Sequence, residues 1–191
     1  MKKIVIFASG SGSNAEKIIL HFKTNRFVNV VGVFTNNKNA KVLEKAKNNN
    51  VDAVIFNKDE LYDGFVLHKL NEMQPDLIVL AGFLLKFPLS IIENFPNKVI
   101  NIHPALLPKY GGKGMYGINI HHSVFENKEV ESGITIHYVN EDYDEGEFIF
   151  QQSINIEDCQ SANEIASKIL LLEHEFFPEV IHRILKTETH V

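Results

Sequence analysis

The sequence predicts a doubly wound α/β fold, with a mostly parallel sheet, helices on both faces and an antiparallel edge in the C-terminal half. In the first half of the chain, short continuous apolar runs alternate with amphipathic segments of helical length. Uninterrupted apolar strands joined by helices are typical of a parallel sheet that is covered on both faces. In the second half, two segments alternate apolar and polar residues, as strands with one covered face do.

The first half is expected to contain five strands and four helices. Short apolar runs predict strands at residues 4–8, 28–35, 51–56, 77–81 and 99–102. Apolar residues at helical spacing predict helices between them, at residues 14–23, 40–49, 60–73 and 89–95. The opening apolar run is too short for the core of a signal peptide, so it is interpreted as a buried first strand.

The second half begins with a long loop at residues 104–117 that is rich in proline and glycine. Loops of this length inside a compact domain are usually functional. We expect a helix to follow, then two strands joined by a turn, and a long closing helix. These elements are expected at residues 118–127, 133–139, 147–156 (with the turn at 140–146) and 161–186. Ser161 and Glu164 have the spacing of a capping box, and Pro178 is expected to end or bend the closing helix.

Composition restricts the kinds of partner. The 191 residues carry a net charge of −5, and the isoelectric point is about 6.0. Duplex nucleic acid requires clustered Lys and Arg, so no nucleic acid partner is expected. No apolar stretch is long enough to cross a membrane, and the single Cys159 cannot form an internal disulfide, which favours a reducing compartment. We therefore expect one cytoplasmic domain, residues 1–191, without membrane association.

A glycine-rich loop, Gly10-Ser11-Gly12-Ser13-Asn14-Ala15, lies between the first strand and the first helix. Glycines let a ligand approach the backbone, and the start of a helix offers free N–H groups to an anion. A dinucleotide site also needs a carboxylate near the end of the second strand, and the sequence there, Phe34-Thr35-Asn36-Asn37, has none. The loop therefore predicts a small phosphate cradle. The alternative is an ordinary strand-to-helix turn in which Ser13 caps the helix with Glu16.

Two polar residues end the fifth predicted strand. Alternation puts Asn101 and His103 on the same side of the strand, and Ile102 on the other. In open α/β sheets, the ligand crevice lies at the carboxyl ends of the strands. The alternative for His103 is a structural hydrogen bond to the backbone. The neighbouring Asn101 and the long loop that follows favour a functional site.

From Asn101 to Gly112 the chain reads NIHPALLPKYGG, which resembles the signature of the folate-dependent formyltransferases. The resemblance covers nearly the whole chain. It includes the glycine-rich loop, the segment that starts Ala81-Gly82-Phe83, the turn that ends Asp144-Glu145-Gly146, and Leu172-Glu173-His174-Glu175 in the closing helix. It implies a Rossmann-like formyltransferase fold, in which residues 1–100 bind the phosphate and ribotide and residues 101–191 carry the catalytic and folate-binding groups.

Within this family, the chain is most similar to the members of purine biosynthesis. These transfer the formyl group of 10-formyltetrahydrofolate, as co-substrate, to the amine of 5-phosphoribosylglycinamide. The resemblance implies catalytic roles for Asn101, His103 and Asp144. It implies ribotide contacts from Ser11, Gly12, Ser13, Asn14 and Glu173, and folate contacts from Leu84, Leu85, Lys86, Phe87, Asn101, Asn140, Glu141 and Asp144. No metal is expected, and the resemblance is compatible with a homodimer.

The implied roles follow from the chemistry of formyl transfer. Asn101 would donate to the oxyanion of the tetrahedral intermediate. Protonated His103 would donate to the same oxygen and later help to protonate N10 of the folate. Asp144 would raise the pKa of His103 and accept the proton of the amine through water.

The chain departs from the family pattern at three points. Leu85 stands where many relatives have Arg, Glu145 stands where the family has Gly, and the loop at residues 110–117 is longer than in some relatives. Because the chain ends at residue 191, we expect no added tRNA-binding or regulatory domain. The adjacent His121 and His122 point about 100° apart on a helix, so they do not indicate a zinc site.

Two other functions fit parts of the sequence. A sugar-nucleotide N-formyltransferase or a formyltetrahydrofolate deformylase would share the Asn, His and Asp, but the glycine-rich loop and Glu173 favour a ribotide acceptor. A non-catalytic nucleotide-binding module would explain the glycine-rich loop alone. It would leave Asn101, His103 and Asp144 without a role.

Overall fold

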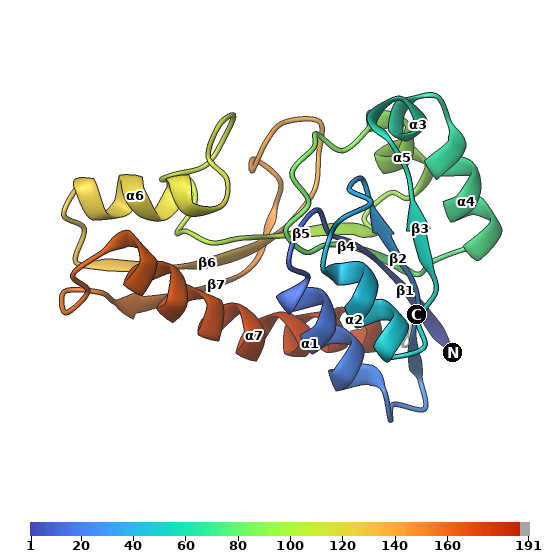
Figure 1. Cartoon of the computed structure of the whole chain (residues 1–191), viewed down its shortest axis with the longest axis horizontal. Coiled ribbons are helices and arrows are strands. Elements are labelled where there is room, and N and C mark those ends of the chain that lie inside the picture. Colours follow the sequence, from blue (N-terminus) through green and yellow to red (C-terminus); the bar gives the residue numbers. More distant parts are fainter. Residues whose placement is uncertain (188–191) are drawn as a thin grey trace.

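The computed structural model describes residues 1–187 and is built around one seven-stranded sheet (Figure 1). The strand order is β3-β2-β1-β4-β5-β6-β7. The first five strands in chain order are mutually parallel, while β6 and β7 are antiparallel to their neighbours. The strands are β1 (Lys2–Phe7), β2 (Val28–Thr35), β3 (Ala53–Ile55), β4 (Leu77–Leu80), β5 (Val99–His103), β6 (Glu131–Tyr138) and β7 (Phe148–Asn155). The predicted fold class is confirmed.

Helices cover both faces of the sheet, which explains the continuous apolar strands. One core cluster joins the sheet to α1 (Ser13–Phe22), α2 (Val42–Asn48), α6 (Ile118–Glu126) and α7 (Ala162–Thr187). The other joins it to α3 (Lys58–Tyr62), α4 (Phe65–Met73) and α5 (Leu89–Asn94). Successive side chains of β1 alternate between the clusters, with Ile4 and Ile6 in the first and Val5 and Phe7 in the second. Across residues 1–187, no helix has both the length and the apolar character needed to cross a membrane.

Local structure departs from the sequence expectations at three elements. The helix expected at residues 60–73 is two helices, because Gly64 adopts a left-handed φ of 101° and separates α3 from α4. The third strand is only three residues long. Of the two outcomes expected at Pro178, an end or a bend of the helix, the end does not occur: α7 continues to Thr187, and the residues around the proline are buried in the core.

The start of α1 also differs from one of the alternatives considered. No side chain caps this helix, so Ser13 does not form the expected capping box with Glu16. Instead Gly12 precedes the helix in a left-handed conformation, and its carbonyl accepts the first helical hydrogen bond, from the N–H of Glu16 (2.9 Å). The amides at the start of α1 are therefore not occupied by a neighbouring side chain.

Strand order determines where a ligand can bind. The chain winds in one direction from β1 to β2 and β3, and in the other through β4 and β5. The loops that follow β1 and β4 therefore run in opposite directions. This change of direction is a topological switch point, and it leaves a crevice at the carboxyl ends of the two strands. The glycine-rich loop follows β1, the segment from Ala81 follows β4, and Asn101 and His103 end β5.

Gly12 is required by its surroundings, so its replacement by alanine should destabilise the protein. A Cβ at this position would lie 2.4 Å from Cγ2 and 2.8 Å from Cα of Val42, and the φ of 67° is unfavourable for any L side chain. We expect Gly12→Ala to lower the free energy of unfolding by about 2 kcal/mol or more in urea denaturation. Gly10→Ala is the matched control, because nothing lies within 4 Å of the added Cβ. If Gly12→Ala and Gly10→Ala had the same free energy of unfolding, the lack of space for a side chain at position 12 would be contradicted.

Candidate active site

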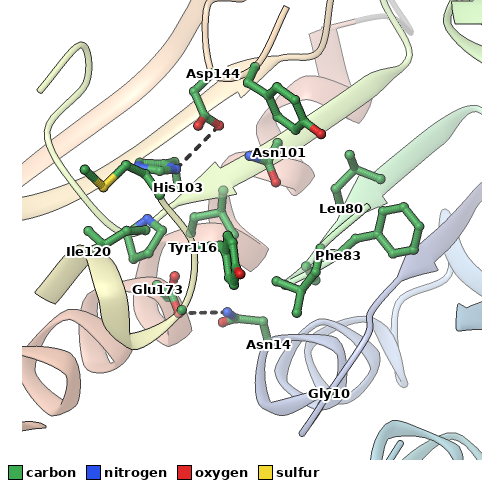
Figure 2. Close-up of a pocket in the computed structure, with 18 of the residues that line it drawn as sticks. Gly10, Asn14, Leu80, Phe83, Asn101, His103, Tyr116, Ile120, Asp144 and Glu173 are labelled. Carbon is green, nitrogen blue, oxygen red and sulfur yellow. Dashed lines mark hydrogen bonds and ion pairs between the residues drawn. The ribbon is translucent and has the colours of Figure 1, made fainter. Parts of the chain in front are cut away.

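A cavity of about 810 Å³ opens at the carboxyl ends of β1, β4 and β5. Its size is typical of a small-molecule site. Its lining comes from the glycine-rich loop, the segment after β4, the end of β5, the loop before α6, the turn between β6 and β7, and α7. Figure 2 shows labelled side chains from each of these segments around it.

The three polar residues singled out in the sequence meet on one side of this cavity. Nδ1 of His103 lies 3.4 Å from Oδ1 of Asp144 (Figure 2). The Nε2–H group of His103 donates to the backbone carbonyl of Tyr110 (2.8 Å). Both nitrogens of the buried imidazole therefore have fixed neighbours, and only Nδ1 faces a titratable group.

His137 is a further member of this group. It lies directly opposite Asn101 in the antiparallel pair of β5 and β6. Its Nδ1–H group donates to the carbonyl of Tyr138 (2.8 Å), so Nε2 faces Nδ2 of Asn101 at 3.2 Å and Oδ1 of Asp144 at 3.6 Å. When neutral, this Nε2 accepts from Asn101, and when protonated it donates to Asp144. The sequence does not reveal this contact of His137, because strand register is not visible from the sequence.

Asp144 is a mostly buried carboxylate with unusually many donors. Burial by itself would raise its pKa. Hydrogen bonds with His103 and His137, the charge of His103 and a hydrogen bond from the amide of Gly112 (3.0 Å) outweigh burial and hold the pKa well below its ordinary value. The carboxylate is thus ionised at any pH at which the protein would work.

His121 of α6 also lines the cavity and is buried. Burial, together with the nearby His103 and His122, lowers its pKa to about 4. Its Nδ1 atom is buried without a hydrogen-bond partner among the described residues. His121 is therefore a neutral polar group at the cavity wall.

The opposite flank of the cavity holds a buried polar pair. Nδ2 of Asn14, in the first turn of α1, donates to Oε2 of Glu173 in α7 (2.8 Å; Figure 2). Burial raises the pKa of Glu173, with the hydrogen bond from Asn14 acting in the other direction. Oδ1 of Asn14 is buried and has no partner among residues 1–187. An unsatisfied buried acceptor costs free energy, and a ligand hydroxyl would satisfy it.

The flank beyond β4 is mainly apolar. Leu80 and Phe83 lie there (Figure 2), and the ring of Phe87 lies 6.1 Å from that of Phe83, centre to centre. The ammonium group of Lys86 lies 5.6 Å from the centre of the Tyr143 ring, and the hydroxyl of Tyr62 donates to the carbonyl of Lys86 (2.8 Å). These contacts connect the segment after β4 to α3 on one side and to the turn at residues 140–146 on the other.

All the site residues expected from the sequence line this one cavity. They are Ser11, Gly12, Ser13, Asn14, Leu84, Leu85, Lys86, Phe87, Asn101, His103, Asn140, Glu141, Asp144 and Glu173. Sequence reasoning missed His121, His137 and the side chains of Met115 and Tyr116. The long loop at residues 104–117 was the signal that could have indicated the last two. In the part of the chain that the structure describes, no cluster of three or more potential ligands could hold a metal ion.

Comparison with known proteins gives consistent matches. A family model described as formyl transferase matches residues 2–181. A chloroplastic phosphoribosylglycinamide formyltransferase of Arabidopsis thaliana is 37% identical over 96% of this chain and 65% of its own length. The phosphoribosylglycinamide formyltransferase of Escherichia coli (strain K12) is 33% identical over 93% of this chain and 84% of its own. This chain thus spans just under two thirds of the Arabidopsis relative.

Solved structures agree with these sequence matches. The crystal structure of phosphoribosylglycinamide formyltransferase from Anaplasma phagocytophilum superposes with a TM-score of 0.89 at 28% identity. The superposition covers 97% of this chain and 88% of the other. The similarity therefore includes the sheet, the cavity-forming loops and the closing helix.

The environment of Asp144 predicts a pH-dependent contribution to stability. Because its folded-state pKa is lowered, Asp144 stabilises the fold above the unfolded-state pKa of about 3.9, and this contribution is lost as the pH falls from there toward the folded-state pKa. We expect Asp144→Asn to lower the free energy of unfolding by about 1 to 3 kcal/mol near pH 6. The difference from the unmodified protein should shrink near pH 3.

Urea denaturation at both pH values measures this difference. Asp142→Asn removes an exposed carboxylate from the same turn and should change stability by less than about 0.5 kcal/mol. A difference for Asp144→Asn that grows as the pH falls would rule out the lowered pKa.

Proposed function

The chain belongs to the formyl transferase family, and we propose that it transfers the formyl group of 10-formyltetrahydrofolate to the amine of 5-phosphoribosylglycinamide in purine biosynthesis. One observation carries the proposal. Asn101, His103 and Asp144 share one cavity with a buried polar flank that suits a phosphorylated sugar and an apolar flank that suits a flat heterocycle.

The polar flank matches the acceptor. Gly12, Ser13 and Asn14 begin α1 without a side-chain cap, so their backbone amides and the helix dipole suit a terminal phosphate. Glu173 and the unpartnered Oδ1 of Asn14 offer acceptors for the hydroxyl groups of a ribose. This combination supports a monophosphorylated sugar over a dinucleotide.

The apolar flank matches the formyl donor. Leu84, Leu85 and Phe87 supply the hydrophobic wall that a pterin ring requires, and Asn140 and Glu141 lie at the facing turn. The donor's N10 would then lie toward Asn101 and Asp144, which line the same cavity.

The proposed reaction balances without any further reactant. The amine nitrogen forms a bond to the formyl carbon, the carbonyl oxygen takes the negative charge, and the bond between that carbon and N10 then breaks. The amine loses one proton and N10 gains one. The side chains must therefore stabilise an oxyanion and move a proton between two nitrogens.

Asn101 is suited to the oxyanion because its amide donates without titrating. One of its two N–H hydrogens is directed at His137 (3.2 Å), and the other is available to the oxygen. A fixed donor of this kind is worth about 3 to 4 kcal/mol in related acyl transfers. His137 acts here as a positioning residue, since it restrains the amide of Asn101.

His103 is suited to the proton transfer. Its Nε2–H group is committed to the carbonyl of Tyr110, so Nδ1 is the atom that exchanges a proton with the reacting centre. The carboxylate of Asp144, 3.4 Å away, balances the positive charge that His103 carries when protonated. Asp144 can also accept the proton of the amine through a water molecule.

The direct test is the loss of 10-formyltetrahydrofolate, followed by absorbance, with and without 5-phosphoribosylglycinamide. The proposal expects turnover only when the ribotide is present. Donor cleavage without an acceptor would instead indicate a hydrolytic deformylase. No turnover under either condition would overturn the proposal and direct the search to amino-sugar nucleotides.

The role of Asn101 predicts a loss of rate with little loss of affinity. Asn101→Ala should lower kcat by about a hundredfold to a thousandfold, because the oxyanion loses a fixed donor. The KM values for both substrates should change by less than about threefold if the donor acts mainly in the transition state. His68→Ala, at an exposed position of α4, controls for a general effect of losing a polar side chain. A kcat equal to that of the unmodified protein would remove Asn101 from the mechanism.

A further inference from the structure

The loop at residues 111–117 carries a tyrosine into the cavity. Tyr116 lines the same cavity as Asn14 and Glu173, and in Figure 2 its ring lies near the middle of the view, on the side of Glu173. The apolar wall with Phe83 lies on the other side of the view. Tyr116 therefore belongs to the polar flank of the cavity.

The backbone of this loop is built to hold that position. Gly112, Gly114 and Gly117 all have left-handed φ angles, of 90°, 93° and 56°. Met115 packs against the core, and its N–H donates to the carbonyl of Gly112 (3.1 Å). The amide of Gly112 is itself bound to Asp144 (3.0 Å). The loop is thus anchored on both the core and the reactive carboxylate, and Tyr116 projects from the anchored part.

Tyr116 has an unused contact surface and an unused hydroxyl. The residue is 52% exposed. Within residues 1–187, the Tyr116 side chain makes no hydrogen bond or ring contact. Other tyrosine hydroxyls are in use: that of Tyr62 donates to the carbonyl of Lys86, and that of Tyr110 donates to the carboxylate of Glu129. An aromatic ring and a free hydroxyl inside a ligand cavity are available for a ligand that has both an apolar face and polar groups. A sugar phosphate ester has both.

We propose that Tyr116 determines acceptor specificity: its ring covers the sugar of the phosphorylated amine, and its hydroxyl donates a hydrogen bond to an oxygen of the same molecule. This inference rests on the proposed function. The location on the Glu173 side of the cavity assigns Tyr116 to the acceptor. Tyr143, which contacts Lys86 at the apolar flank, is the corresponding tyrosine on the donor side.

Calorimetric titration with 5-phosphoribosylglycinamide alone tests the assignment. Tyr116→Ala should weaken binding by about tenfold or more, because the ring and the hydroxyl are both lost. Tyr116→Phe should weaken it by about two- to tenfold, because only one hydrogen bond is lost. The KM for 10-formyltetrahydrofolate should change by less than about twofold in both variants, because neither variant loses a hydrogen bond to the donor. Tyr143→Ala is the matched control, and it should raise the donor KM while the acceptor affinity stays unchanged.

Each result has a definite meaning. Acceptor affinity that is unchanged in Tyr116→Ala would overturn the inference, provided that the unmodified protein transfers formyl groups to the ribotide. Equal losses of donor and acceptor binding would also overturn it, because they indicate a loop with a general structural role. Failure of the unmodified protein to bind or formylate the ribotide would instead overturn the proposed function, and the inference with it. Thermal denaturation of each variant separates loss of binding from loss of folding.

Discussion

The buried carboxylate of Asp144 is the constraint on which the site depends. A charge in the interior is tolerated only when it is compensated by donors. Here the donors come from three different segments: His103 ends β5, His137 lies in β6, and the amide of Gly112 belongs to the loop before α6. Satisfying one carboxylate therefore connects the long loop to two strands that are already paired in the sheet. Asp144 itself has a left-handed backbone, with φ of 58°.

Two kinds of scaffold meet at the cavity. The reactive side chains are held by strands or by short contacts to them, so their positions follow from the hydrogen-bonded sheet. The substrate-facing groups come from loops and from helix starts, such as the glycine-rich loop before α1. This division is common in α/β folds, where a rigid sheet supports loops that carry recognition. Asp144 itself lies in the turn between β6 and β7, and its contacts with His103 and His137 connect that turn to the strands, whereas the unused contact surface of Tyr116 lies in a loop.

Much of this arrangement could be predicted from the sequence. The continuous apolar strands predicted the parallel sheet, and alternation along β5 predicted that Asn101 and His103 share a side. Features that depend on contacts between distant segments could not be predicted. His137 joins the site because of the register of β6 against β5, and Tyr116 because of the path of a glycine-rich loop. The continuation of α7 through Pro178 reflects core packing that outweighs the local effect of proline.

The anchoring of the loop at Gly112 has a consequence for how this protein can diverge. The amide that holds the loop is a backbone group, so its contact with Asp144 does not depend on which side chains the loop carries. Replacements at Lys113 or Tyr116 can therefore accumulate without disconnecting the loop from the reactive carboxylate. Mutational drift in this segment would change which amine is accepted while the chemical step is inherited intact. The architecture separates the evolution of substrate range from the evolution of catalysis.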